Sequence, residues 1–365
     1  MRFAHIADTH LGYRQYNLDE REEDFYRAFE EAVEVIIEEK LDFVLHSGDL
    51  FDEPRPPIKA LVRVKKVLER LKSHGIPFIC IAGNHDILMR SGAVPPQKVF
   101  SNIELLTPRK PYIEYEGIFI AGLPYFSKIH RNNMKNMLEK LYEKAKDYDK
   151  SILLLHQGID KYFNLDFELK LQDLPDNFNY YALGHIHKRI VDTLPSGAIA
   201  AYPGSTEIWR MDELEEFRKH GKGFFIVNTD DFSHQEVNLR SIRPFLNFEV
   251  SGVEEVRDIV REAEKVRVKP VVKVEVGNND FNEVYRRLLI ELKEKALYLD
   301  IKRKIEKNIK NEDVRGEKID IKSLMRESFE GSEEEKNFCL DIYKAIVREG
   351  AEAGTNIAES YFNRQ

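Results

Sequence analysis

Short apolar runs alternate with amphipathic segments in the first part of the chain. Apolar runs cover residues 2–7, 43–45 and 78–82. The segments between them, residues 25–37 and 58–71, carry apolar residues at helical spacing. The order strand, helix, strand, helix, strand is typical of a mainly parallel sheet covered by helices on both faces. The pattern therefore predicts an α/β fold with functional residues at the carboxyl ends of the strands.

The pattern continues with a strand pair and a further helix. Residues 111–126 are typical of a hairpin-like pair, and residues 134–146 of a helix. Two more apolar runs, 152–155 and 180–183, predict further strands, and strands are also expected within 198–230.

The composition changes near residue 241, and it divides the rest of the chain into four parts. Residues 241–301 predict strand, helix, strand, helix, strand, which indicates a small α+β domain. Residues 302–318 are almost wholly charged or polar and are interpreted as a linker. Residues 319–350 predict a pair of helices, and the small, polar tail at 351–365 is expected to be mobile. Residues 1–240 form the main domain in this division.

An apolar stripe follows the second of the C-terminal helices. Phe338, Ile342 and Ile346 recur at helical spacing. Two short helices behind a charged linker cannot bury such a stripe alone, so we expect them to dock on a partner protein. The alternative is that they fold back on the main domain of the same chain.

The composition is that of a globular protein, and it limits the ligands that any metal site can use. The 365 residues are 42% hydrophobic, which is enough for several cores, and no apolar run approaches the about 20 residues of a membrane span. The N-terminus is interpreted as a strand, without a signal segment, so a cytoplasmic protein is expected. A net charge of −8 argues against a globally basic nucleic-acid surface and leaves a local basic groove open. Cys80 and Cys339 lack metal-ligand spacing, so any metal site must use oxygen and nitrogen ligands.

Polar residues that can bind metals follow five of the predicted strands. They are Asp8 and His10, Asp49, the run Asn84, His85 and Asp86, His156, and the pair His185 and His187. One such histidine is commonly a structural hydrogen-bonding residue. Five coincidences at the same end of a sheet are hard to ascribe to packing, so they indicate one site.

This residue set suits two divalent ions better than one. Two cations about 3.5–4 Å apart need a shared anionic oxygen, and they can clamp both the attacking and the leaving oxygen of a phosphate ester. Asp49 is the candidate bridge. Imidazoles, carboxylates and an amide oxygen without thiolate suit Mn²⁺, Fe²⁺ or Zn²⁺.

The motifs around these residues resemble those of calcineurin-like metallophosphoesterases. More narrowly, they resemble the archaeal double-strand-break repair nuclease, which is related to SbcD and to the eukaryotic meiotic-recombination nuclease. The motifs lie within residues 1–240 and read HIADTHLGY, HSGDLF, AGNHD, LHQG, YALGHIHKR and YPGS. The resemblance implies a β-sandwich core flanked by helices, a small α+β capping domain that positions DNA, and a C-terminal helix pair.

The resemblance also implies a role for each site residue. One manganese ion would be held by Asp8, His10, Asp49 and His187, and the other by Asp49, Asn84, His156 and His185. His85 would protonate the departing sugar 3′ oxygen, and Asp86 would orient it. A histidine beside an acidic neighbour has a pKa range suited to that task.

The chain departs from the family at Asp52. The family often has a histidine three residues after the bridging aspartate, where it helps to hold the phosphate. A carboxylate there would repel the phosphate, so another cation compensates or the balance of exonuclease and endonuclease activity differs. On this interpretation, Asp52→His is expected to raise exonuclease turnover.

Partners follow from the same resemblance and from the loops beside the site. The family acts on DNA ends and single strands, forms a homodimer through helices that correspond to residues 58–71 and 97–105, and is grasped through its C-terminal helices by an SMC-like coiled-coil ATPase. A nucleoid-associated location is implied. Leu61 is a candidate dimer contact. The candidate DNA contacts are foremost Tyr13, Arg55 and Arg90, and then Arg14, His130, Arg131, Lys188 and Arg189.

The resemblance therefore implies a manganese-dependent DNA nuclease, expected to be a 3′ to 5′ exonuclease on duplex ends and an endonuclease on single strands. One alternative is a phosphatase or small-molecule phosphodiesterase on the same fold. Against the protein-phosphatase branch, which has the motif Gly-Asp-x-Val-Asp-Arg-Gly, Asp49 of this chain is followed by Leu-Phe-Asp. The other is a DNA-binding scaffold without activity, which would be expected to have lost metal ligands.

Overall fold

The computed structural model describes residues 1–88, 90, 92–163, 167–277, 281–304 and 337–342. Residues 1–304 form one compact unit, and residues 305–365 form a second. Within the described residues, no helix has the length and apolarity needed to cross a membrane.

The first sheet has six strands, and its central strands are parallel. In the order β12-β11-β1-β2-β3-β4, β1 to β4 run parallel, and β11 and β12 are antiparallel to their neighbours. Helices α1 and α2 pack on its outer face. The bounds are β1 (Arg2–Ile6), β2 (Phe43–His46), β3 (Phe78–Cys80), β4 (Ile103–Leu105), β11 (Gly223–Asn228), β12 (His234–Asn238), α1 (Asp19–Glu38) and α2 (Ile58–Ser73).

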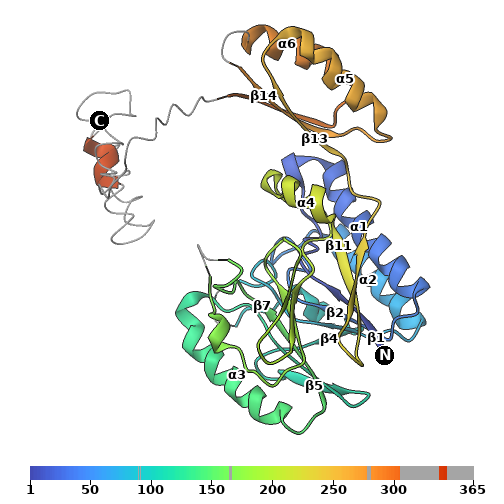
Figure 1. The fold of residues 1–365 in the computed structure, drawn as a ribbon, viewed down its shortest axis with the longest axis vertical. Coiled ribbons are helices and arrows are strands. Elements are labelled where there is room, and N and C mark those ends of the chain that lie inside the picture. The colour runs from blue at the N-terminus through green and yellow to red at the C-terminus, as the bar shows by residue number, and fades with distance from the viewer. Residues whose placement is uncertain (89, 91, 164–166, 278–280, 305–336, 343–365) are drawn as a thin grey trace. The chain divides into compact units, whose positions relative to one another are not determined.

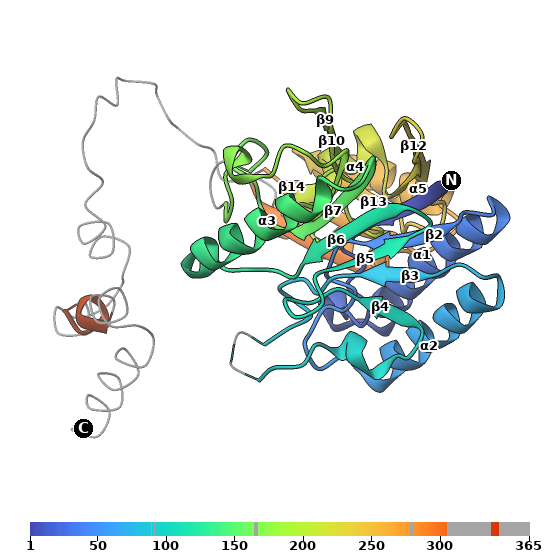
Figure 2. The same cartoon turned by 90° about the horizontal axis from the view of Figure 1, so that it is seen from below.

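The second sheet repeats this plan. In the order β5-β6-β7-β8-β10-β9, the strands from β6 to β10 are parallel, and the two edge strands are antiparallel. Helix α3 covers its outer face, on the other side of the two sheets from α1 and α2 (Figures 1 and 2). The bounds are β5 (Tyr112–Tyr115), β6 (Ile118–Leu123), β7 (Lys150–His156), β8 (Tyr180–Gly184), β9 (Ile190–Thr193), β10 (Ile199–Tyr202) and α3 (Arg131–Ala145).

The two sheets pack face to face over a shared apolar core. Phe3, Phe43 and Leu45 of the first sheet meet Ile120 and Leu154 of the second, and all five are fully buried. The β-sandwich flanked by helices is thus confirmed. The predicted parallel sheet is present in β1 to β4, but its inner face is covered by a second sheet and not by helices, and the five strand ends belong to two sheets. Strand–helix alternation does not specify whether β6 pairs with β4 or begins a new sheet.

A three-stranded parallel sheet with two helices follows the sandwich. The five elements predicted between residues 245 and 301 are present, and they surround an apolar core of their own. The bounds are β13 (Phe245–Val250), α5 (Val256–Lys265), β14 (Val271–Val276), α6 (Phe281–Leu292) and β15 (Tyr298–Arg303). The remaining elements are α4 (Leu214–His220) and the 3₁₀ helices η1 (Gln15–Asn17), η2 (Pro96–Val99), η3 (Lys128–His130), η4 (Leu171–Asp173), η5 (Met211–Glu213) and η6 (Val253–Glu255).

A buried ionic network joins α1 to the segment that leads into β13. Asp24, fully buried, accepts hydrogen bonds from Arg21 at 2.5 Å and from Arg243 at 2.5 and 2.8 Å. Arg21 also donates to Glu207 at 3.3 Å. This carboxylate therefore satisfies two buried guanidinium groups from different parts of the fold.

Replacing Asp24 with alanine is expected to lower the free energy of unfolding by about 3–5 kcal/mol, because two buried cations lose their common partner. Urea denaturation of the full chain measures the change. Asp258→Ala on α5 is the matched control, because its carboxylate pairs with Arg261 at 3.2 Å on the surface with 75% of its side chain exposed. An exposed pair contributes about 0–1 kcal/mol, so similar losses in the two variants would contradict this account.

Candidate metal centre

The predicted site residues meet where strands of both sheets end. Asp8 follows β1, Asp49 follows β2, and His85 belongs to the loop after β3. His156 is the last residue of β7, and His185 follows β8. The carboxyl ends of these parallel strands lie at one edge of the sandwich, so loops distant in sequence supply one site.

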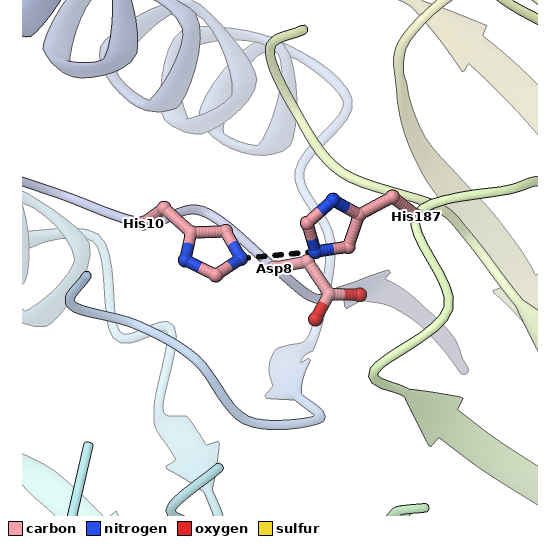
Figure 3. Close-up of side chains that lie close together, drawn as sticks. All are labelled: Asp8, His10 and His187. Carbon is pink, nitrogen blue, oxygen red and sulfur yellow. Dashed lines mark hydrogen bonds between the residues drawn. The ribbon is translucent and has the colours of Figure 1, made fainter. Parts of the chain in front are cut away.

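Asp8, His10 and His187 form the first group of donor atoms. One ligand atom from each lies within 4.8 Å of the others. Figure 3 shows the two imidazoles pointing at one another, with 3.1 Å between their Nε2 atoms. Two ligands at right angles around one ion, each about 2.1 Å from it, would be about 3.0 Å apart, so this spacing suits a shared cation.

Asp49, His156 and His185 form the second group, and Asn84 joins it. The Nε2 of His156 lies 3.1 Å from Oδ2 of Asp49. The Oδ1 of Asn84 lies 3.1 Å from the same nitrogen and 3.0 Å from Nδ1 of His185. The amide oxygen and the two imidazoles therefore converge, as ligands of one ion would.

Asp49 lies between the two groups. Its Oδ1 accepts the backbone N–H of His85 at 2.8 Å, which fixes the carboxylate. Its Oδ2 lies 3.1 Å from Nε2 of His156 and 3.9 Å from Nε2 of His10. One oxygen is thus held by the backbone, while the other faces both groups, which is the arrangement that a bridging ligand requires.

The backbone conformations of several donors are strained. Asp8, His10, Asp49 and His185 have φ values of 53°, 44°, 54° and 93°, in the left-handed region that side chains rarely adopt. Such conformations cost of order 1–3 kcal/mol each and persist where the surroundings enforce them, often at functional sites. The loops are therefore shaped to aim these side chains inward.

Charges in the second group are already paired. Burial opposes the charged forms of both Asp49 and His156. The charge of His156 nevertheless lowers the pKa of Asp49. The charges of Asp49 and Asp8 in turn raise the pKa of His156 to about 9. Burial and the charge of His156 lower the pKa of His185 to about 3. A metal ligand has to be unprotonated, so a cation would displace the His156 proton. The buried donors, all oxygen or nitrogen, fit two divalent cations.

His85 lies beside the first group. Its Nδ1 donates a hydrogen bond to the backbone oxygen of Asp52 at 2.8 Å, and its ring meets His10 edge to face at 4.9 Å. The side chain is 28% exposed. The carbonyl fixes one ring nitrogen as a donor, so the other, Nε2, is the one that can exchange a proton with a substrate.

Asp86 has a different task from the predicted one. Its carboxylate accepts the backbone N–H groups of Gly83 and Phe51 at 2.9 Å and of Leu50 at 3.2 Å. It therefore ties two loops together, whereas Asp52 holds His85. Burial, and then the charge of Asp49, raise the pKa of Asp86 to about 6.

Sequence reasoning missed the groups behind His187. Its Nδ1 lies 2.8 Å from Oε1 of Glu213, and Lys222 donates to the other oxygen of Glu213 at 2.5 Å. Burial raises the pKa of Glu213, but Lys222 and His187 outweigh this effect and lower the pKa to about 2. Glu213 is 26 residues from His187, and no motif links the two.

The candidate DNA contacts differ in how far their side chains are exposed. Arg55 and Arg90 are exposed, and Tyr13 is half-buried against Phe25 and Trp209. Two of the wider candidates make hydrogen bonds within the chain. Arg189 is 8% exposed and donates to Glu236 at 2.9 Å and to the backbone of His220 at 2.7 Å, and Arg131 donates to the backbone of Phe167 and Glu168.

The model of the family described as calcineurin-like phosphoesterase matches residues 1–189. Fold, site and match together define a metal-dependent phosphodiesterase.

Archaeal proteins named DNA double-strand break repair protein Mre11 are similar over most of the chain. The one from Methanocaldococcus jannaschii is 37% identical, covering 100% of this chain and 99% of its own. The one from Methanococcus maripaludis is 34% identical over 95% of both chains, and the one from Saccharolobus solfataricus is 42% identical over 64% of this chain and 61% of its own. The chain belongs to this Mre11 family of calcineurin-like phosphoesterases, which confirms the resemblance predicted from its motifs.

Gly83→Ala is expected to weaken Mn²⁺ binding at least about tenfold, by analogy with other changes that displace ligand-supporting groups. A Cβ at this position would lie 2.1 Å from Oδ1 and 2.4 Å from the backbone nitrogen of Asp49, so the bridging carboxylate would have to move. Calorimetric titration of the metal-free protein measures the affinity. Gly277→Ala, whose Cβ would meet only ordinary contacts at 3.7–3.9 Å, is the control. Equal affinities in both variants would refute a bridging role for Asp49.

Proposed function

We propose that this chain is a manganese-dependent DNA nuclease that degrades duplex ends 3′ to 5′ and cuts single strands internally. The observation that carries the proposal is Asp49 Oδ2 lying between two groups of imidazole donors, with His85 beside them. The names of the relatives point to DNA double-strand breaks as the setting. A cytoplasmic, nucleoid-associated location is proposed because it suits a nuclease that acts on DNA breaks.

Two ions per chain would occupy this site. The first would be held by Asp8, His10, Asp49 and His187, and the second by Asp49, Asn84, His156 and His185. Manganese is proposed because imidazole and carboxylate ligands together suit it, whereas Mg²⁺ prefers oxygen ligands and retains waters. When bound, the cations supply Lewis-acid polarisation of the phosphodiester and activation of a water.

The chain's own contribution to the reaction is proton transfer and positioning. His85 holds a proton at Nε2 and delivers it to the departing 3′ oxygen, while its Nδ1–H remains bonded to the Asp52 carbonyl. That hydrogen bond fixes the orientation of the His85 ring. Asp86 keeps the loop carrying His85 against the loop carrying Asp49.

DNA would be bound through its phosphates beside the site. Arg55 and Arg90 are exposed on loops that flank the metal donors, and Tyr13 lies on the loop after His10. Contacts to phosphates position a duplex without reading its sequence, so a broad substrate range is expected. Local cations serve this purpose although the net charge of the chain is −8.

A homodimer is supported by apolar side chains exposed on α2 and near η2. Ile58 is 79% exposed, Val62 46% and Val99 67%. Leu61, the predicted contact, is half-buried and packs partly on the chain's own core. Exposed apolar residues that gather on neighbouring elements are typical of an interface.

His85→Ala is expected to bind two Mn²⁺ ions normally and to lose roughly 10²–10⁴-fold in DNA cleavage, because the leaving oxygen loses its proton donor. Cleavage of duplex and single-stranded DNA in Mn²⁺ and in Mg²⁺, with metal content, checks this. His74→Ala, an exposed histidine at the end of α2, is the control. Full DNA cleavage by metal-loaded His85→Ala would exclude the general-acid role. A wild type that cleaves a small nucleotide phosphodiester but no DNA would exclude the nuclease.

The helix pair predicted for residues 319–350, most of which lies outside the described residues, is proposed to bind an SMC-like coiled-coil ATPase. Residues 337–342 are helical, with Phe338 and Ile342 half-buried, and Ile346 lies outside the described residues. Deleting residues 319–365 is expected to abolish co-purification with that ATPase and to leave nuclease activity on single strands intact, because the metal donors lie within residues 8–187. Retained co-purification would locate the interface elsewhere.

A further inference from the structure

Asp52 contacts the back of the first metal group. Its Oδ1 lies 3.2 Å from Nδ1 of His10 and accepts the indole N–H of Trp209 at 3.0 Å. The side chain is 13% exposed. This carboxylate is turned toward His10 and Trp209, so it contacts a metal donor and not only the space that a phosphate would occupy.

Nδ1 of His10 is fully buried and has no aligned hydrogen-bond partner among the described residues. The Oδ1 of Asp52 lies 3.2 Å from this nitrogen, within ion-pair distance. A neutral imidazole carries one proton. A carboxylate next to Nδ1 places that proton on Nδ1 and leaves the lone pair on Nε2, the nitrogen that faces His187. Carboxylates behind ligating histidines commonly fix the tautomer and ring orientation in this way.

Trp209 braces the same histidine from another direction. Its ring stacks on His10, with centroids 5.2 Å apart and planes 26° apart. The same ring lies edge to face with the rings of His85 and His187, with centroids 5.6 Å and 5.1 Å apart. The indole that holds Asp52 thus also restricts the ring that Asp52 orients.

Each imidazole of the first metal group has a carboxylate beside its Nδ1. Glu213 contacts Nδ1 of His187 as Asp52 contacts Nδ1 of His10. In the second group, Nδ1 of His156 donates to a backbone carbonyl, that of Ser47, at 2.7 Å. A substitution at residue 52 should therefore change the affinity for the first metal ion and leave the affinity for the second unchanged.

We propose that Asp52 and Trp209 form a positioning unit that holds Nε2 of His10 toward the first metal ion and sets the affinity of that ion. The inference rests on the proposed dinuclear site. It reverses the expectation for Asp52→His: this variant should lose metal affinity, and its turnover should not rise.

The test is Mn²⁺ titration of the metal-free full chain, followed by calorimetry and by emission of Trp209, the single tryptophan. Asp52→Ala is expected to weaken one of two binding steps about 10–100-fold, which is the usual effect of losing such a partner. Asp52→Asn keeps an acceptor and should weaken that step less. Trp209→Phe, followed by calorimetry, keeps the stacking and loses the N–H donor, and it should weaken the same step.

Glu53→Ala, an exposed carboxylate one residue away, is the matched control and should leave both steps unchanged. Thermal unfolding of each metal-free variant tests whether it folds. If Asp52→Ala does not fold, the comparison of metal affinities is made with Asp52→Asn. With Mn²⁺ saturating, the KM for DNA should stay at the wild-type value in Asp52→Asn. Unchanged metal binding with a changed KM would overturn the inference in favour of a phosphate contact. A wild type that binds fewer than two ions would instead overturn the proposed function.

Discussion

A buried carboxylate shared between two groups of imidazoles is the constraint on which the site depends. Asp49 is 1% exposed and carries a negative charge among histidines from both sheets. An isolated buried charge would be costly, so its surroundings have to supply compensating cations or hydrogen bonds. In this structure the backbone N–H of His85 and the ring of His156 supply part of that compensation. Two divalent cations would complete it.

The sandwich makes this arrangement possible. Parallel strands bring their carboxyl ends to one edge, and packing two such sheets face to face brings the loops of both to the same place. Neither sheet alone carries the full donor set, since Asp8 and Asp49 follow strands of the first and His156 and His185 belong to the second. The apolar core between the sheets therefore determines the distance between the two donor groups.

Neighbouring carboxylates serve different purposes here. Asp86 follows His85 in sequence yet binds the backbone of two loops, whereas Asp52 holds His85 through its carbonyl and faces His10 with its side chain. Glu213 supports His187 from a segment with no motif. Adjacency in sequence is a poor guide to such contacts, because a side chain's partner depends on the path of the loop that carries it.

The sequence by itself determined the order of strands and helices, the position of the metal donors at strand ends, and the family, because periodicity and local motifs are properties of short segments. It could not decide that the strands form two sheets, since pairing between distant strands depends on long-range packing. It could not assign Asp52, Trp209 or Glu213 to the metal donors either, because those contacts depend on residues far apart in sequence. His187 and Glu213 are 26 positions apart, and Asp52 and Trp209 are 157 positions apart. Asp52 looked like a departure that would weaken phosphate binding. Only the folded chain turned its carboxylate toward a histidine, because the loop after β2 closes against Trp209.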